Sequence, residues 1–207
     1  MVHSDWRDGF LFVGNQLALD FVNTRPIQDE KVIELIPDFE SLLRWFRAAG
    51  LLDASQLKTL QKRCSTSMNA PGTLKRMREF REALRKAIFS WESSGSIGRD
   101  FVAELNRLMA SHPMRLRLQR NAGGFSTDSW FSPREPEDLI SPIAQAAAKL
   151  FSTSDHNRVR KCEHCILHFH DTSKIGTRRW CSMRICGNRA KVAAYTARRR
   201  NQKSGRS

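Results

Sequence analysis

The chain has 207 residues, of which 40% are hydrophobic, and a formal net charge of +14. This length suits one medium domain with a small added module, and the hydrophobic share supports a packed core and excludes a disordered chain. No apolar run reaches the roughly 18 residues that a transmembrane helix needs, which excludes a membrane-spanning protein. The N-terminus carries Asp5, Asp8 and Asp20 and no apolar export signal, so we expect a cytoplasmic protein.

The first part of the chain predicts short helices. Residues 10–13 are an apolar run ended by Gly14, and Asn15 can cap a helix that ends near Asn23. We expect the polar groups at the end of this helix to cap it and to hold the next loop, with a ligand site as the alternative. Two more helices are expected at 38–50 and 53–64, because aspartates suited to N-capping precede apolar residues at helical spacing.

A long amphipathic helix is expected from about residue 73 to residue 91. Its basic face, which includes Arg78, Arg81 and Arg85, is expected to be solvated, with nucleic-acid contact as the alternative. The buried face should carry Leu74, Met77, Phe80, Leu84, Ile88 and Trp91.

Three further elements follow before residue 152. A helix is expected from Gly98 or Asp100 to before Pro113, a β-hairpin around Asn121–Gly124, and an alanine-rich helix from Leu139 to Phe151. The sequence therefore predicts a mainly α chain with a small β-hairpin (α+β), in which residues 1–152 form a helical domain.

The positive charge is concentrated in the C-terminal quarter. Residues 156–207 hold 14 Lys and Arg against 2 acidic residues, a net charge of +12. Residues 1–155 hold 21 basic and 19 acidic residues, which leaves +2. This asymmetry is typical of a module that binds a polyanion, because each cation placed on a phosphate releases counterions; a basic solubilising tail is the alternative.

Four of the five cysteines fall within 25 residues as two close pairs. Cys162 and Cys165 have the spacing of a zinc knuckle, and after fifteen residues Cys181 and Cys186 supply a second pair. Two disulfides or four unrelated core cysteines are the alternatives, but disulfides require an oxidising compartment, and the surrounding residues are mostly charged. Four cysteine ligands leave no position open for water, so we expect one structural zinc ion and no catalytic metal.

Other residues compete for the role of ligand. His164, His168 and His170 lie near the first pair; we expect them to be solvated or to support the ligands, with replacement of one cysteine as the alternative. Cys64 is expected in a helix away from this cluster.

The last helix is expected to begin near Cys186, so that the last ligand sits in its first turn. That order predicts a treble-clef-like finger over residues 156–200, with a zinc ribbon as the alternative and residues 201–207 as a basic tail. Ala190, Ala193, Ala194 and Ala197 form a narrow stripe, which we expect to lie against the knuckle and loop.

The outer face of this helix and the preceding loop are expected to contact DNA phosphates and one groove. The residues expected to do so are Arg178, Arg179, Arg184, Arg189, Lys191, Arg198, Arg199 and Arg200.

Two stretches resemble known families. Trp180-Cys181-Ser182-Met183 followed by Cys186-Gly187-Asn188-Arg189, together with Phe169-x-Asp171-Thr172-Ser173, is similar to the signature of the CGNR zinc finger. Leu17-Ala-Leu-Asp-Phe-Val-Asn-Thr24 resembles the opening of the ABATE domain, which commonly precedes that finger. The resemblance implies a bacterial transcription regulator linked to stress.

We therefore expect a zinc-dependent DNA-binding regulator whose N-terminal domain senses an unidentified effector or forms a homodimer. An RNA-binding protein with the same finger is one alternative, and a ligand-sensing or protein-interaction module without nucleic acid is another. An enzyme is not expected, because no catalytic arrangement of Ser, His, Asp or Cys is recognisable.

Overall fold

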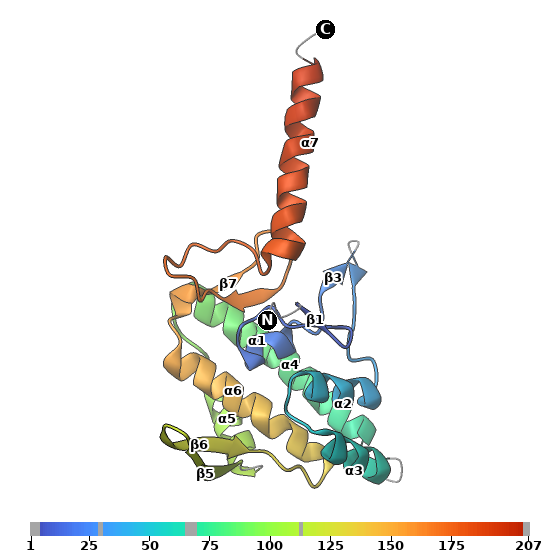
Figure 1. Cartoon of the computed structure of the whole chain (residues 1–207), viewed down its shortest axis with the longest axis vertical. Coiled ribbons are helices and arrows are strands. Elements are labelled where there is room, and N and C mark those ends of the chain that lie inside the picture. The colour runs from blue at the N-terminus through green and yellow to red at the C-terminus, as the bar shows by residue number, and fades with distance from the viewer. Residues whose placement is uncertain (1–4, 29–30, 65–69, 112–113, 205–207) are drawn as a thin grey trace.

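The computed structural model describes residues 5–28, 31–64, 70–111 and 114–204. It shows a mainly helical body from which one helix projects along the long axis (Figure 1). The helices are α1 (Leu17–Val22), α2 (Phe39–Ala48), α3 (Ala54–Cys64), α4 (Ala70–Ser94), α5 (Arg99–Ser111), α6 (Ile140–Thr153) and α7 (Asn188–Ser204).

Within the described residues, the strands form small antiparallel pairs and not one sheet. Three pairs belong to the body: β1 (Trp6–Arg7) with β2 (Phe10–Leu11), β3 (Ile27–Gln28) with β4 (Lys31–Val32), and β5 (Arg115–Asn121) with β6 (Gly124–Trp130). The fourth pair joins β7 (Val159–Lys161) to β8 (His168–His170) in register Val159↔His170, close to the base of α7. The fold is thus the predicted one, a helical N-terminal domain followed by a small finger.

The core of the body forms between α1, α2, α4 and α6. Trp45 lies at its centre with no exposed surface, in edge contact with Phe21 and Phe46 and stacked near Phe12. The predicted apolar face of α4 is confirmed, because Met77, Phe80, Leu84, Ile88 and Trp91 are all buried in this core and Leu74 packs against it.

Helix boundaries differ from the prediction where backbone conformation decides them. Asn15 does not cap α1: its φ of 59° is left-handed, and the residue before the helix is Gln16. Helix α4 begins at Ala70 and not near Thr73, with Pro71 in the first turn, where a missing amide costs nothing. The hairpin β5–β6 matches the prediction; its turn is Ala122–Gly123, and Gly124, at φ 126°, begins β6 directly after it.

The basic face of α4 is only partly solvated, which corrects the sequence expectation. Arg81 is 2% exposed, and its guanidinium binds the carboxylate of Glu34 and the hydroxyl of Thr24, the latter at 2.8 Å. Arg78 and Arg85 donate to the backbone carbonyls of Ile36 and Val22. These three arginines therefore hold the loop after α1 onto α4, and are not free for a polyanion.

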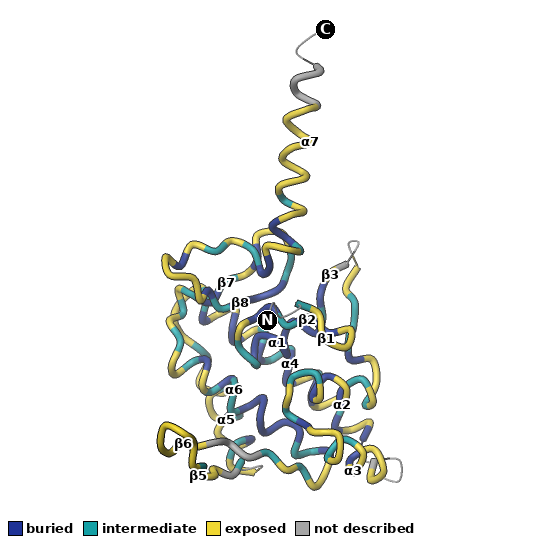
Figure 2. The backbone as a smooth tube through the Cα atoms, viewed as in Figure 1, coloured by how far each residue is buried: buried dark blue, intermediate teal, exposed yellow. Residues whose placement is uncertain are grey.

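Helix α7 also departs from the prediction. Ala193, Ala194 and Ala197 are exposed and only Ala190 is half-buried, so the stripe does not lie against the knuckle. Figure 2 shows the described part of α7 exposed almost throughout, in contrast to the mixed burial of the body. The helix continues to Ser204, past the predicted end of the finger at residue 200.

None of the helices in the described part of the chain is both apolar enough and long enough to cross a membrane.

Candidate metal centre and nucleic-acid interface

The first cysteine pair sits at the tip of the β7–β8 hairpin. Cys162 directly follows β7, and its amide donates to the carbonyl of Leu167 at 2.8 Å, which closes the knuckle. Cys165 lies within that closed turn. The hairpin register therefore turns both sulfurs toward the same side.

The second pair sits where the chain enters α7. Cys181 precedes Ser182, whose hydroxyl accepts hydrogen bonds from the amides of Arg184 and Ile185 and so starts the π-helical turn Met183–Gly187. Cys186 lies in this turn, one residue before Gly187. The last ligand thus precedes the helix directly, as in the treble-clef order.

The four sulfurs fit a single tetrahedral ion. The Sγ atoms of Cys162, Cys165, Cys181 and Cys186 all lie within 4.8 Å of one another, and Cys181 is 3.6 Å from both Cys165 and Cys186. A zinc–sulfur distance of about 2.3 Å in a tetrahedron requires sulfur separations of about 3.8 Å. The cluster contains no histidine. It is a site for one structural zinc ion.

The four thiols lie close enough to shift one another's pKa values. Hydrogen bonds from the thiols of Cys165 and Cys181 lower the pKa of Cys162, whereas the hydrogen bond to Cys162 raises the pKa of Cys165 to about 12. The same crowding raises the pKa of Cys181. Because these thiols cannot all ionise side by side, a bound metal that deprotonates its thiol ligands resolves the conflict.

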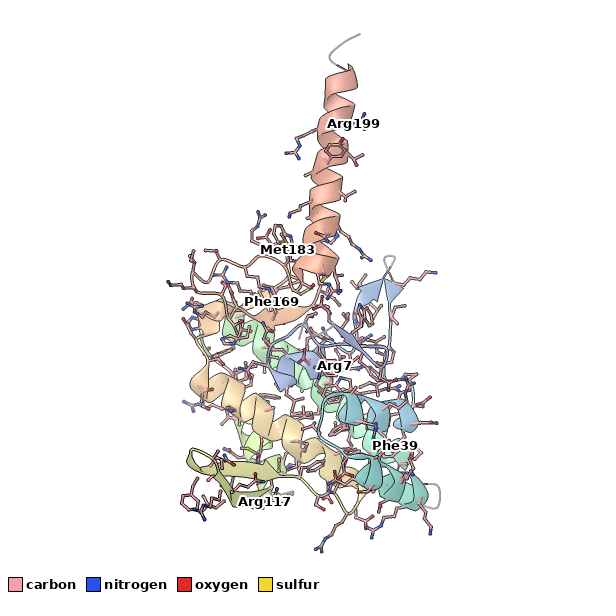
Figure 3. All side chains as sticks on the ribbon, in the orientation of Figure 1. Arg7, Phe39, Arg117, Phe169, Met183 and Arg199 are labelled. Carbon is pink, nitrogen blue, oxygen red and sulfur yellow. The ribbon has the colours of Figure 1, made fainter. Side chains whose placement is uncertain are left out.

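A small core shields the cluster. Phe169 is fully buried beside the cysteines, and Trp180 packs against them from the loop. The guanidinium of Arg178 lies over the Phe169 ring, 4.6 Å from its centroid, and donates to the backbone carbonyls of Trp180 and Cys181. Figure 3 places Phe169 between the base of α7 and the body.

The N-terminal domain completes this core. Leu11 and Val13 are buried in the same cluster as the cysteines. The amide of His170 donates to the carbonyl of Gly14 at 2.8 Å, and the side chain of Asn15 donates to the carbonyl of His170. The finger therefore extends the interior of the N-terminal domain.

Asn23 makes the most specific of these contacts. Its side-chain amide donates to the carbonyl of His168 at 2.8 Å and accepts from the amide of His168 at 3.0 Å. Asn23 is fully buried, so both hydrogen bonds are shielded from water. It holds β8 as a neighbouring strand would.

Two acidic residues of the N-terminal domain also bind the finger. Glu92, near the end of α4, accepts from the amide of Lys161 at 2.7 Å and lies 3.3 Å from His168 Nε2. Asp5 accepts from the Ser182 hydroxyl at 2.6 Å. Sequence reasoning missed both residues, and it assigned Asn23 only to its own loop, because their partners lie far away in the chain.

The predicted nucleic-acid contacts divide into two groups. Arg178 directs its donors into the finger, as described above, and Arg179 forms a bidentate pair with Glu163. The other five have exposed side chains that make no ion pair with any described residue: Arg184, Arg189, Lys191, Arg198 and Arg199. The side chain of Arg200 lies outside the described residues.

The five exposed cations follow the outside of the second knuckle and α7. Figure 3 shows Arg199 far along the projecting helix, with Met183 at its base. This part of the chain thus presents positive charge that the fold itself does not use.

Comparison with protein families gives two matches. The model of ABATE, described as "Putative stress-induced transcription regulator", matches residues 15–154. The model of the CGNR zinc finger matches residues 158–199. A comparison with curated proteins found no match.

Proposed function

The chain belongs to the ABATE family and ends in a CGNR zinc finger, and on that basis we propose that it is a transcription regulator that binds DNA through α7. The observation that supports this most is the projection of α7 from the body with its cations exposed. A structural zinc would hold the base of this helix in place, because the last ligand lies in the turn that leads into it.

The dimensions of α7 favour DNA over duplex RNA. Seventeen helical residues extend about 25 Å, and a helix of about 10–12 Å diameter fits the major groove of B-DNA. The major groove of A-form RNA is deep and too narrow for side chains to read. We therefore propose that α7 lies in the major groove of DNA, with Arg184 and Arg189 on the adjacent phosphates.

The division of labour follows from the same arrangement. Residues 1–152 would sense an effector or form a dimer, and residues 156–200 would bind DNA, with the helix continuing into the basic tail 201–207. Catalysis is not part of the proposal, because four cysteines close the metal site and both matching families are described without an enzyme activity.

The salt dependence of DNA binding tests the proposal. In one variant, Lys191, Arg198 and Arg199 are changed to Gln. If each of the three residues contacts one phosphate, the slope of log K against log salt falls by about 2.7 relative to the wild-type protein. Binding to a duplex of random sequence, measured by fluorescence anisotropy across a salt series, gives this slope.

A matched control removes the same charge elsewhere. Lys58, Arg99 and Lys149 are exposed on the N-terminal domain, and changing all three to Gln should leave most of the slope intact. Equal losses in the two variants would show that net charge alone drives binding and would reject α7 as the contact surface.

A further inference from the structure

A hollow of about 390 Å³ lies where α4 meets the finger. Small-molecule sites occupy about 300–1,000 Å³ and often lie at such junctions. Three lining residues come from α4 and three from the β7–β8 hairpin: Arg85, Lys86, Phe89, Lys161, Ile166 and His168.

Two of the three cations of this pocket, Lys86 and Lys161, are available to an anion. Lys86 and Lys161 are exposed and form no ion pair with any described residue. Arg85 is fixed in place by the Val22 carbonyl, at 2.7 Å, and by Glu82, at 3.5 Å. The carboxylate of Glu92 accepts from the backbone amide of Lys161 and lies 3.3 Å from His168 Nε2. Two ammonium groups at the mouth are therefore without an ion pair among the described residues.

An aromatic ring and a buried imidazole complete the pocket. Phe89 is 59% exposed, although the opposite face of its helix, α4, packs in the core. His168 is only 3% exposed; its Nε2 lies 3.3 Å from the carboxylate of Glu92, whereas its Nδ1 makes no hydrogen bond within the described residues. One buried ring nitrogen at the pocket wall is therefore left for a hydrogen bond to a ligand.

We propose that this junction pocket binds a nucleoside phosphate. The phosphate would lie between the ammonium groups of Lys86 and Lys161, and the base would stack on the ring of Phe89, as bases do on exposed aromatic side chains. Ile166 would cover the second face of the base, with His168 at the wall. Scattered solvated lysines account for neither the exposed ring of Phe89 nor the unpartnered Nδ1 of His168.

The position of the pocket gives the ligand a route to the finger. Lys161 directly precedes Cys162, and a neighbouring hollow that also contains Lys161 and Ile166 reaches Arg189 at the start of α7. A nucleotide held by α4 and the hairpin together would favour the docked position of the finger. By linkage, it would then change the affinity of α7 for its partner.

Isothermal titration of the full-length, zinc-loaded protein without DNA tests the pocket, with AMP, ATP, adenosine and inorganic phosphate as probes at physiological salt. The two nucleotides should bind, and adenosine and phosphate should each bind at least about tenfold more weakly, because each retains only one of the two contacts. Lys86→Gln and Phe89→Ser change exposed side chains and should each weaken AMP binding about tenfold.

Lys58→Gln is the matched control, because Lys58 is equally exposed but lies on α3. If AMP binds no better than phosphate, or if Lys58→Gln weakens binding as much as Lys86→Gln, the proposal is wrong. The variant with Lys191, Arg198 and Arg199 changed to Gln should keep its affinity for AMP. The two proposals can therefore fail separately. If this variant keeps its affinity for DNA, binding of DNA through α7 is wrong, whereas the pocket is judged by AMP binding alone.

A DNA arm distinguishes a free nucleotide from a nucleotide within a nucleic acid. If no free nucleotide binds but Lys86→Gln and Phe89→Ser weaken binding to duplex DNA, the pocket belongs to the nucleic-acid contact surface and the proposal of a free ligand is overturned.

Discussion

The two halves of the C-terminal module are held in opposite ways. Residues 159–187 are held by the N-terminal domain. Asn23, Glu92 and Asp5 form hydrogen bonds with this segment, and Leu11 and Val13 pack in its core. Helix α7 leaves this base and has exposed side chains from residue 191 to residue 199. The first half is therefore built for the fold, and the second is available to a partner.

This contrast changes the interpretation of the alanines in α7. Isolated helices of this length are marginal in water unless their residues favour the helix strongly. Alanine has the highest helix propensity, and Ala193, Ala194 and Ala197 are exposed, so packing in the described structure does not require a small side chain at these positions. We infer that these alanines keep the free helix formed, so that its cations are already arranged.

Loss of a ligand should have the largest effect, and it acts on both halves. Cys186→Ser removes one thiolate, and zinc binding supplies folding free energy on the order of 10 kcal/mol to such modules. We expect loss of zinc, loss of amide protection across residues 159–187 and loss of DNA binding. The α1–α6 core should stay folded, because its cluster includes only Val159 from the finger. Elemental analysis and hydrogen exchange measure these effects.

Cys64→Ser is the control for this variant, since Cys64 belongs to α3. It should keep one zinc per chain. A Cys186→Ser protein that also keeps one full zinc equivalent would reject the four-cysteine ligand set.

The second prediction concerns Asp20, which supports the docked half from within. Its carboxylate accepts from the amide of Gly14 at 2.8 Å, and Gly14 in turn accepts from His170. Burial raises the pKa of Asp20 from an ordinary value of 3.8 to about 7, against the opposing effects of the Gly14 amide and of Arg7. Between about pH 4 and about pH 7, the native state therefore keeps the proton on Asp20, whereas the unfolded chain has lost it.

The sign of the pH dependence follows. Since the native state binds more protons, the free energy of unfolding should fall as pH rises from about 4 to about 7, by on the order of 4 kcal/mol from this group. Asp20→Asn keeps an oxygen for Gly14 and should lose that fall. Urea unfolding of both proteins across the interval measures the difference; parallel curves would contradict a raised pKa.

The third prediction separates docking from metal binding. Asn23→Ala leaves the amide and carbonyl of His168 buried without partners, which should lower the free energy of unfolding by about 3 kcal/mol. Zinc content should not change, because the ligands are untouched. Urea unfolding and hydrogen exchange at His168 measure the effect.

Asn106→Ala, at an exposed position of α5, is the control and should change stability by less than about 0.5 kcal/mol. If the Asn23 variant is as stable as this control, the two hydrogen bonds between Asn23 and His168 do not hold the finger in position.

Local patterns predicted much of this structure. The helical spacing of Met77, Phe80 and Leu84 predicted which face of α4 is buried, because period 3.6 is a property of neighbouring residues. The paired spacing of the cysteines predicted the metal cluster for the same reason, since each pair sits in one short turn. Both signals lie within a few residues of chain.

Contacts between distant segments could not be predicted in this way. Asn23 and His168 are separated by 145 residues, and no local pattern connects them. Arg81 looked solvated because its face of α4 is basic, whereas Glu34, 47 residues earlier, covers it. The stripe of alanines in α7 indicated close packing. Only the position of the rest of the finger shows that Ala193, Ala194 and Ala197 are exposed.

The smallest expected effect tests the free half of the comparison. Ala194→Gly lowers helix propensity by about 1 kcal/mol at an exposed position of α7. Because Ala194 is exposed, the thermal midpoint of the body should not change. DNA affinity should fall by about fivefold, since the bound state must now order a less stable helix.

Ala103→Gly makes the same change at an exposed position of α5, a helix that packs on the core, and should have the reverse pattern: a lower thermal midpoint with unchanged DNA affinity. Circular dichroism melting and anisotropy titration of the two variants measure both quantities. A lower thermal midpoint for Ala194→Gly would mean that α7 packs against the body in solution, and the contrast between the two halves of the module would then be lost.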